Sequence, residues 1–420
     1  MKRALVLAGG GSRGAYEIGA WKALNELGVR FQAVYGTSIG AINAALFAQG
    51  DFETAQRVWS EIRIDQIVRT DDTDLSLDEL IPNKRDLVGF LRENRKFINM
   101  DITPLEELLQ RCLSEARIRA AGLELGFMAV RIPQMQAAPI RLSDMREGTL
   151  RDWVIASASC FPVFPVRRIA SDRYVDGGFV DNLPVDMALA DGCDEIVAVD
   201  PHPNPAHPEY HGMPFLRLVY PLHSLGGFLD FDPGLLRRSR LLGYNDTMKA
   251  FGRMEGIKYT FVTEDPMDHA DAAHRYALAA ARFDAEAIRR GALASSQLQN
   301  APLIRALTGE TPLRRLSWND VWLRGLELMA EVLGFREDAI YRADQLIGRG
   351  RRLAEGSEPS PDVSPATLAK RQAEGRRSLF TCIWQWLNAN GGCPEASVPA
   401  LAKYPAETAA ALFLYCAAGA

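Results

Sequence analysis

Apolar residues in the first fifty positions alternate between two spacings. Residues 4–8 form a short, continuous apolar run, which is typical of a buried strand. Within residues 15–27 the apolar side chains recur at every third or fourth position and therefore share one face of a helix. A second short strand is expected over residues 31–35 and a second helix over residues 39–49, and each helix is followed by a glycine. Two consecutive strand–turn–helix units predict a parallel sheet with crossover helices.

The same alternation returns later in the chain. A helix, the end of a strand, a second helix and a buried strand are expected in that order over residues 151–159, 174–176, 184–192 and 195–200. A last strand is expected at residues 258–263, and beyond about residue 265 the spacing indicates helices without strands. The fold class is therefore α/β, with a parallel-rich central sheet flanked by helices and a helical C-terminal extension.

This pattern divides the chain into two regions. Residues 1–265 form one α/β domain, whose residues 4–200 carry the motifs described below, and residues 266–420 form a helical region without an assigned role. Residues 51–120 are more helical and polar, so we interpret them as an insertion that covers the sheet. Residues 356–365 are rich in proline and serine and resemble a linker.

Composition narrows the classes of function. The 420 residues include 48 Lys and Arg against 53 Asp and Glu, a net charge of −5, which gives no bulk reason to bind nucleic acid. The six cysteines show no C-x-x-C spacing, so we expect free thiols and no zinc site. The N-terminal apolar run is too short for a secretory signal, and no stretch approaches the ~20 apolar residues that span a bilayer. A cytoplasmic protein is expected.

The first candidate motif is a G-x-S-x-G sequence with Ser38 between Gly36 and Gly40. It lies between the expected strand at 31–35 and the expected helix at 39–49. A serine on such a sharp strand-to-helix turn projects its hydroxyl above the edge of the sheet, and the flanking glycines permit the tight backbone. The helix that follows presents the positive end of its dipole to developing negative charge. Ser38 is therefore a candidate nucleophile.

The second candidate is a glycine loop with Gly9, Gly10, Gly11, Arg13 and Gly14. Glycines let backbone N–H groups approach a ligand oxygen closely, and several such groups form an anion site. The loop also fits the G-x-G-x-x-G pattern of dinucleotide-binding turns. That function requires an acidic residue about 20 positions later, at the end of the second strand. The second expected strand is followed by a glycine, a threonine and a serine, so the dinucleotide interpretation fails.

The third candidate is Asp176, which follows an expected strand end and precedes Gly177 and Gly178. Carboxylates at the carboxyl ends of strands lie where α/β sheets place ligand-binding groups. An ordinary turn stabilised by the aspartate side chain is the alternative, and it would be preferred if this motif stood alone.

Together these motifs resemble the patatin-like phospholipase family over roughly residues 4–200. Residues 9–14 are similar to its oxyanion loop, residues 36–40 to its nucleophile elbow, and residues 176–178 to its D-G-[AG] base motif. The run of alanine and serine at 156–162, which ends in Phe161-Pro162, is similar to the helix and turn that precede that base. The resemblance implies a patatin-like fold and hydrolysis of lipid acyl esters by a Ser–Asp dyad, without a metal or cofactor. The C-terminal third shows no such resemblance.

We therefore expect Ser38 to attack the ester carbonyl and Asp176 to accept its proton and later to activate water. Amides of the loop at residues 10–13 would hold the oxyanion, and Arg13 could add positive charge there. An unperturbed aspartate, of pKa ~3.9, is a weak base for this step, so desolvation or transition-state stabilisation must compensate. The expected partner is a lipid or acyl-ester substrate, and the oligomeric state is left open.

Three alternatives stay open. In chain order, Ser38, Asp176 and His202 would suit a catalytic triad, although the prolines on both sides of His202 indicate a solvated loop. A metal site formed by His202, His207 and His211 is less favoured, because the prolines between them exclude a helical frame. A catalytically silent lipid-binding or scaffold protein on the same fold is the non-enzymatic alternative.

One C-terminal segment could contact a membrane. Residues 366–389 carry four basic residues and one acidic residue, and then an apolar stripe formed by Phe380, Ile383, Trp384 and Leu387. Basic residues beside an aromatic face are typical of interfacial helices that lie on anionic lipid. An amphipathic helix packed within the protein has the same pattern and is the more common case.

Overall fold

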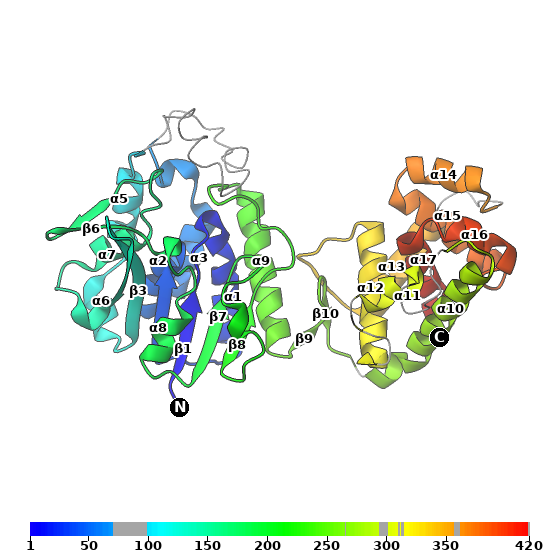
Figure 1. The fold of residues 1–420 in the computed structure, drawn as a ribbon, viewed down its shortest axis with the longest axis horizontal. Coiled ribbons are helices and arrows are strands. Elements are labelled where there is room, and N and C mark those ends of the chain that lie inside the picture. Colours follow the sequence, from blue (N-terminus) through cyan, green and yellow to red (C-terminus); the bar gives the residue numbers. More distant parts are fainter. Residues whose placement is uncertain are drawn as a thin grey trace. The chain divides into compact units, whose positions relative to one another are not determined.

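The computed structural model describes residues 1–69, 99–264, 266–293, 301–309, 311, 315–356 and 362–418 (Figure 1). It forms two compact units, Met1–Phe251 and Gly252–Ala420. Part of the expected insertion at 51–120 and half of the linker-like stretch at 356–365 lie outside the described residues. In its described part the insertion is helical, as predicted.

The first unit contains a mixed eight-stranded sheet in the order β5-β6-β3-β2-β1-β7-β8, and β4 pairs with β3 outside this path. Its strands are β1 Arg3–Leu7, β2 Ala33–Thr37, β3 Glu124–Ile132, β4 Gln136–Arg141, β5 Arg167–Ile169, β6 Asp172–Asp176, β7 Glu195–Val199 and β8 Leu216–Val219. β1, β2, β3, β7 and β8 are parallel to one another, whereas β4, β5 and β6 join the sheet through antiparallel pairs. The predicted parallel-rich sheet is confirmed.

Helices cover this sheet on both faces, as Figure 1 shows. The helices of the unit are α1 Ala15–Glu26, α2 Ile39–Ala48, α3 Phe52–Glu61, α5 Thr103–Cys112, α6 Glu115–Ala120, α7 Leu150–Ser157, α8 Val185–Ala190 and α9 Pro233–Ala250. Short 3-10 turns lie at η1 Gly11–Gly14, η2 Ile64–Gln66, η5 Leu142–Asp144, η6 Gly177–Phe179 and η7 Pro208–Tyr210.

Alternation along β1 explains the three layers. Leu5 and Leu7 belong to the apolar cluster that α1 and α2 form on one face of the sheet. Ala4 and Val6 belong to a separate cluster with α8 on the other face. Because successive side chains of a strand point to opposite faces, a strand covered on both sides must be apolar throughout. This is the continuous run that the sequence displays at residues 4–8.

The second unit is mainly helical, as predicted for the C-terminal region. Its helices are α10 Ala270–Arg289, α11 Pro302–Thr308, α12 Trp318–Leu333, α13 Ala343–Glu355, α14 Pro365–Ala373, α15 Arg376–Ala389, α16 Val398–Leu401 and α17 Pro405–Ala418, with 3-10 turns η8 Pro266–His269 and η11 Glu395–Ser397. A small sheet in the order β11-β10-β9 joins Ile340–Tyr341, Thr260–Val262 and Met254–Glu255. The expectation of no strand beyond residue 265 was wrong at β11, because two residues are too few to show a period and β11 is defined by its pairing with β10.

The apolar stripe of residues 366–389 lies in the core of the second unit. Phe380, Ile383, Trp384 and Leu387 are all buried there, and α17 packs against α15. Two of the nearby cations form ion pairs inside the same unit, with Arg371 bound to Glu374 and Arg376 bound to Glu407. The structure supports the packed amphipathic helix, the more common of the two alternatives, because other parts of the same unit already cover the apolar stripe. Among the helices of the described residues, none is long and apolar enough to cross a membrane.

We predict that Phe380→Ala will destabilise the second unit by about 3–5 kcal/mol, because it deletes a fully buried aromatic ring. Chemical denaturation followed by fluorescence measures this change. Arg377→Ala, an exposed change on the same helix, is the control and should shift the midpoint little. Equal and small effects of the two substitutions would contradict the core assignment.

Candidate active site

Ser38 occupies a strained turn between β2 and α2. Its backbone has φ 56° and ψ −124°, a conformation that L-residues rarely adopt. Both flanking glycines are required by space. A Cβ at Gly36 would lie 2.2 Å from the carbonyl oxygen of Gly40, and a Cβ at Gly40 would lie 2.4 Å from the carbonyl oxygen of Leu7. The predicted elbow geometry is therefore present, and strain of this kind accompanies functional turns.

Asp176 is level with Ser38 at the edge of the sheet. In β3, Met128 pairs with Thr37 and the next residue, Ala129, pairs with Asp176. The Ser38 hydroxyl Oγ donates a hydrogen bond of 2.6 Å to Asp176 Oδ2. The two side chains that the sequence predicted to act together, 138 positions apart, are thus in direct contact.

The two glycines after Asp176 shape its carboxylate environment. The Gly178 amide donates to Asp176 Oδ1 at 2.8 Å, so each carboxylate oxygen accepts one hydrogen bond. A Cβ at Gly177 would lie 2.3 Å from the carbonyl oxygen of Met128, so only glycine allows the chain to pass the neighbouring strand this closely. Close packing against β3 therefore explains why glycine follows Asp176 in the base motif.

Burial changes the acidity of Asp176. The residue is 6% exposed, and desolvation raises the pKa of Asp176 to about 6, although the hydrogen bonds from Ser38 and Gly178 lower it. A carboxyl group in this range is still mainly ionised at neutral pH and is a stronger base than an exposed aspartate. The desolvation that the sequence analysis required is present at this site.

The alanine- and serine-rich end of α7 holds the serine and the aspartate in place. Ser157 Oγ accepts a hydrogen bond of 3.0 Å from the Ser38 amide and donates one of 2.6 Å to the Met128 carbonyl. The carbonyl of Ser159 accepts from the Asp176 amide at 2.9 Å. The run at residues 156–162 is part of the family resemblance, but its pattern alone indicated no role for Ser157 or Ser159.

The glycine loop lies beside Ser38. A Cβ at Gly9 would lie 3.0 Å from Ser38 Cβ and 2.4 Å from Asn182 Oδ1. Asn182, which the sequence analysis did not identify, ties the loop to the segment after Asp176. Its carbonyl accepts from the Gly9 amide at 3.0 Å and its side chain donates to the Gly9 carbonyl at 3.2 Å. Gly9 therefore lets the loop approach Ser38 closely, and its amide is already bonded to Asn182 and is not a donor for an oxyanion.

Two amides of the loop remain as donors for an oxyanion. The Ser12 amide donates to Phe228 O and the Arg13 amide to Gly10 O. Among the described residues, the amides of Gly10 and Gly11 have no acceptor. The predicted oxyanion loop therefore has two candidate donors, Gly10 and Gly11, which directly follow Gly9, the residue that lies against Ser38.

The other loop residues are structural in this arrangement. Arg13 Nε donates to the carbonyl of Gly226 at 2.7 Å, which ties the loop to the segment that follows β8. A Cβ at Gly14 would lie 2.7 Å from Ile39 Cγ1, so glycine permits close packing against α2.

A buried polar network joins the helices that follow the two motifs. Asn43 of α2 donates to Glu17 Oε2 of α1 at 2.7 Å and to the Gly14 carbonyl at 3.1 Å, and it accepts from Trp59 Nε1 at 2.8 Å. Burial raises the pKa of Glu17 well above its ordinary value, although the hydrogen bond from Asn43 lowers it. The sequence analysis missed this network, since nothing in the spacing of Glu17 and Asn43 indicates that they meet.

The histidines considered as alternatives have separate partners. His202 Nδ1 lies 2.6 Å from Asp200 Oδ1, His207 contacts Asp181 and Glu209, and His211 lies 3.1 Å from the carbonyl of Ala206. Although burial opposes the effect, Glu209 and Asp181 raise the pKa of His207. Among the described residues, no group of three or more His, Cys, Asp or Glu side chains is arranged to hold a metal ion.

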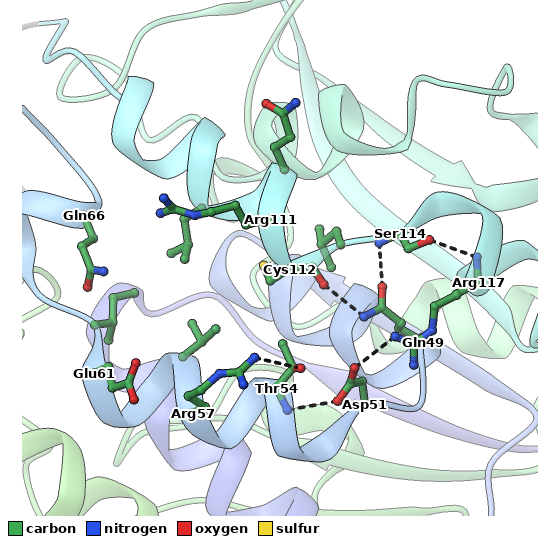
Figure 2. Close-up of a pocket in the computed structure, with 15 residues that line it drawn as sticks. Gln49, Asp51, Thr54, Arg57, Glu61, Gln66, Arg111, Cys112, Ser114 and Arg117 are labelled. Atoms are coloured by element: carbon green, nitrogen blue, oxygen red, sulfur yellow. Dashed lines mark hydrogen bonds and ion pairs between the residues drawn. The ribbon is translucent and has the colours of Figure 1, made fainter.

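A separate cavity lies in the first unit. Figure 2 shows this cavity of about 640 Å³, which α3, α5 and the segment after α5 line. Its polar lining includes Arg57, Glu61 and Arg111, and Gln49 bridges Cys112 and Ser114 by hydrogen bonds at its end. Ser38 and Asp176 are not among its lining residues. We assign no part of the chemistry to this cavity.

Comparisons with known proteins agree with the motifs. A family model described as patatin-like phospholipase matches residues 5–189. Patatin-like phospholipase domain-containing protein 7 of Rattus norvegicus is 28% identical over 199 residues, which cover 47% of this chain and 13% of that protein. An uncharacterized NTE family protein of Mycobacterium tuberculosis is 30% identical over 200 residues, which cover 47% of this chain and 30% of the relative. The chain thus matches only a minor part of each relative's length.

The structure was also compared with solved structures. The crystal structure of VipD from Legionella pneumophila aligns over 99% of this chain and 90% of VipD, with 13% sequence identity and a TM-score of 0.34.

The raised pKa of Asp176 predicts an acid limb in the rate profile. Proton transfer to Asp176 requires its ionised form, so kcat/KM should fall about tenfold per pH unit below about pH 6 and level off above it. An initial-rate profile on a neutral, soluble short-chain ester measures this dependence. A profile that stays flat to pH 4 would contradict the assignment of this carboxyl group as the base.

The two unpaired amides predict a loss of rate on substitution of the loop. In Gly10→Ala the new Cβ would lie 3.0 Å from Pro201 Cγ, so the loop must shift, and the rate should fall about 10²–10³-fold, the scale of losing one oxyanion donor. Gly348→Ala in α13, whose nearest contact would be 3.6 Å away, is the matched control and should leave the rate unchanged. A normal rate in a folded Gly10→Ala variant would mean that the loop is only structural.

Proposed function

We propose that the chain, whose residues 5–189 match a family model described as patatin-like phospholipase, is a serine acyl-hydrolase acting on acyl esters of phospholipids, lysophospholipids or related lipids. The observation that carries the proposal is the 2.6 Å hydrogen bond from Ser38 Oγ to a buried Asp176. A nucleophile in direct contact with a base of suitable acidity is the minimal arrangement for acyl transfer.

In the first half-reaction Ser38 Oγ attacks the carbonyl carbon of the ester while Asp176 Oδ2 takes the hydroxyl proton. The carbonyl oxygen becomes an oxyanion, which the amides of Gly10 and Gly11 and the N-terminus of α2 stabilise. Collapse of the tetrahedral intermediate breaks the bond to the alcohol oxygen. That oxygen takes the proton from Asp176, and the acyl group remains on Ser38.

In the second half-reaction Asp176 takes a proton from water, and the resulting hydroxide attacks the acyl carbon. The same amides hold the second oxyanion. Collapse then releases the fatty acid, and Ser38 Oγ recovers the proton from Asp176. The cycle consumes one water molecule and requires neither a metal nor a cofactor.

The geometry supports a dyad over a triad. The Ser38 hydroxyl donates to Asp176 at 2.6 Å, so the position that a histidine would occupy in a triad is taken by the carboxylate itself. His202 instead contacts Asp200, a different carboxylate. In this proposal His202 takes no proton from Ser38.

A non-enzymatic lipid-binding protein is the second candidate. The strained backbone of Ser38 argues against it, because φ 56° costs free energy that a silent site has no need to retain. A lipid hydrolase must also reach its substrate at a membrane or micelle surface. We do not propose α15 as the element that binds this surface, because its apolar face is buried.

Covalent labelling tests the proposal. A fluorophosphonate should modify Ser38 in the wild type, Ser38→Ala should abolish both labelling and ester hydrolysis, and Asp176→Asn should lower the rate about 10²–10⁴-fold, the range of a general base. Ser143→Ala, which removes an exposed serine, is the control. Labelling of another serine with Ser38 unmodified would overturn the scheme. Lipid binding without labelling or turnover would favour the scaffold.

A further inference from the structure

A buried carboxylate follows β7 on the far side of the glycine loop from Asp176. β7 pairs with β1, and the Ala8 amide, just before the loop, donates to the Val199 carbonyl at 3.1 Å. Asp200 comes next and is 1% exposed. Its Oδ2 accepts from the Ala206 amide at 2.9 Å and its Oδ1 contacts His202 Nδ1 at 2.6 Å.

The contact with Asp200 fixes the role of one ring nitrogen of His202 and leaves the other unpaired in the part of the chain that the structure describes. A carboxylate only accepts hydrogen bonds, so Nδ1 is the donor in this pair. Nε2 has no hydrogen-bond partner among the described residues, and 28% of the side chain is exposed. A histidine oriented in this way presents one nitrogen to a ligand, as histidines held by a carboxylate do in other binding sites.

His202 stands directly beside the proposed oxyanion donors. The position of a Cβ on Gly10 lies 3.6 Å from His202 Cε1, the carbon bonded to Nε2, and 3.4 Å from Arg13 Cβ. The corresponding position on Gly9 lies 3.0 Å from Ser38 Cβ. The loop therefore has Ser38 on one side and, one residue further along, an imidazole and a positively charged side chain.

We propose that His202, oriented by Asp200, is a specificity residue that binds the phosphate of a phospholipid headgroup while Ser38 attacks the acyl ester. In a phospholipid, only a few bonds separate the phosphate from the ester carbonyl, so a phosphate group would lie next to the oxyanion loop. Held between the Asp200 carboxylate and a phosphate, a ring with a proton on each nitrogen would donate to both anions. This inference rests on the proposed hydrolase function and names its substrate class.

The role differs from that of a triad histidine. A base would be needed for every ester, whereas a headgroup contact matters only for substrates that carry a phosphate. The ratio of kcat/KM between a phospholipid and a neutral lipid of the same acyl chain therefore separates the two roles.

The test compares wild type, His202→Ala and His211→Ala on three substrates. These are a phosphatidylglycerol and a diacylglycerol with identical acyl chains in the same mixed micelles, and a soluble short-chain ester. His211→Ala is the matched control, since this imidazole lies on the same loop and its hydrogen bond goes to the Ala206 carbonyl. Rates are normalised to the fraction of protein that a fluorophosphonate labels, so unfolded protein does not count.

We expect His202→Ala to lower kcat/KM for the phospholipid about 10–100-fold, mainly through KM, because a charge-assisted hydrogen bond is lost. The diacylglycerol and the soluble ester should be unaffected, and His211→Ala should match wild type on all three substrates. An equal loss on every substrate, or no loss on the phospholipid, would overturn the proposal.

Two further outcomes are informative. In the first, wild type prefers diacylglycerol, and inorganic phosphate inhibits ester hydrolysis by wild type but not by His202→Ala. This result would assign the site to a free anion and overturn the headgroup role. Wild type that shows neither labelling nor turnover of any ester would instead refute the hydrolase function itself, and so the two failures are distinguishable.

Discussion

A single requirement organises the first unit: a carboxylate must be kept out of water while it touches a serine hydroxyl. The contact between Ser38 and Asp176 is 2.6 Å long, and burial of the carboxyl group raises the pKa of Asp176 to about 6. Such a group is stable only if both oxygens are hydrogen-bonded. Gly178 supplies the second bond, and Gly177 can approach β3 closely enough only because it has no side chain. The two glycines after Asp176 are thus needed to bury its carboxylate with both oxygens hydrogen-bonded.

The strain at Ser38 is maintained by the segments around it. Its amide donates to Ser157 of α7, and the helix that follows it is joined to α1 through the bond between Asn43 and Glu17. Asn182 holds the glycine loop to the segment after Asp176. Every motif is therefore tied to another by a partly buried polar bond, and such satisfied networks favour one geometry over its alternatives.

Local patterns predicted neither β3 nor β8, but they did predict the motifs and several elements around them, because each of these depends on neighbours in sequence. The continuous apolar run of β1 and the turn around Ser38 are examples. Apart from the pairing of Ser38 with Asp176, which the family resemblance implied, contacts between distant residues could not be predicted. The bond between Glu17 and Asn43, and the choice of Gly10 and Gly11 as unpaired amides, depend on how separate segments meet. The stripe of α15 shows the same limit, since periodicity identifies an apolar face and does not reveal what covers it.

The order of strands explains why two buried carboxylates near one serine take different roles. Asp176 ends β6, which pairs with β3 on one side of β2, and so it reaches the Ser38 hydroxyl. Asp200 follows β7, beyond β1 on the other side, and the glycine loop lies between it and Ser38. Chain order alone suggested that an aspartate and His202 could serve one triad. The sheet separates them instead. In our proposal, proton transfer takes place on the β3 side of Ser38 and substrate charge is recognised on the β7 side.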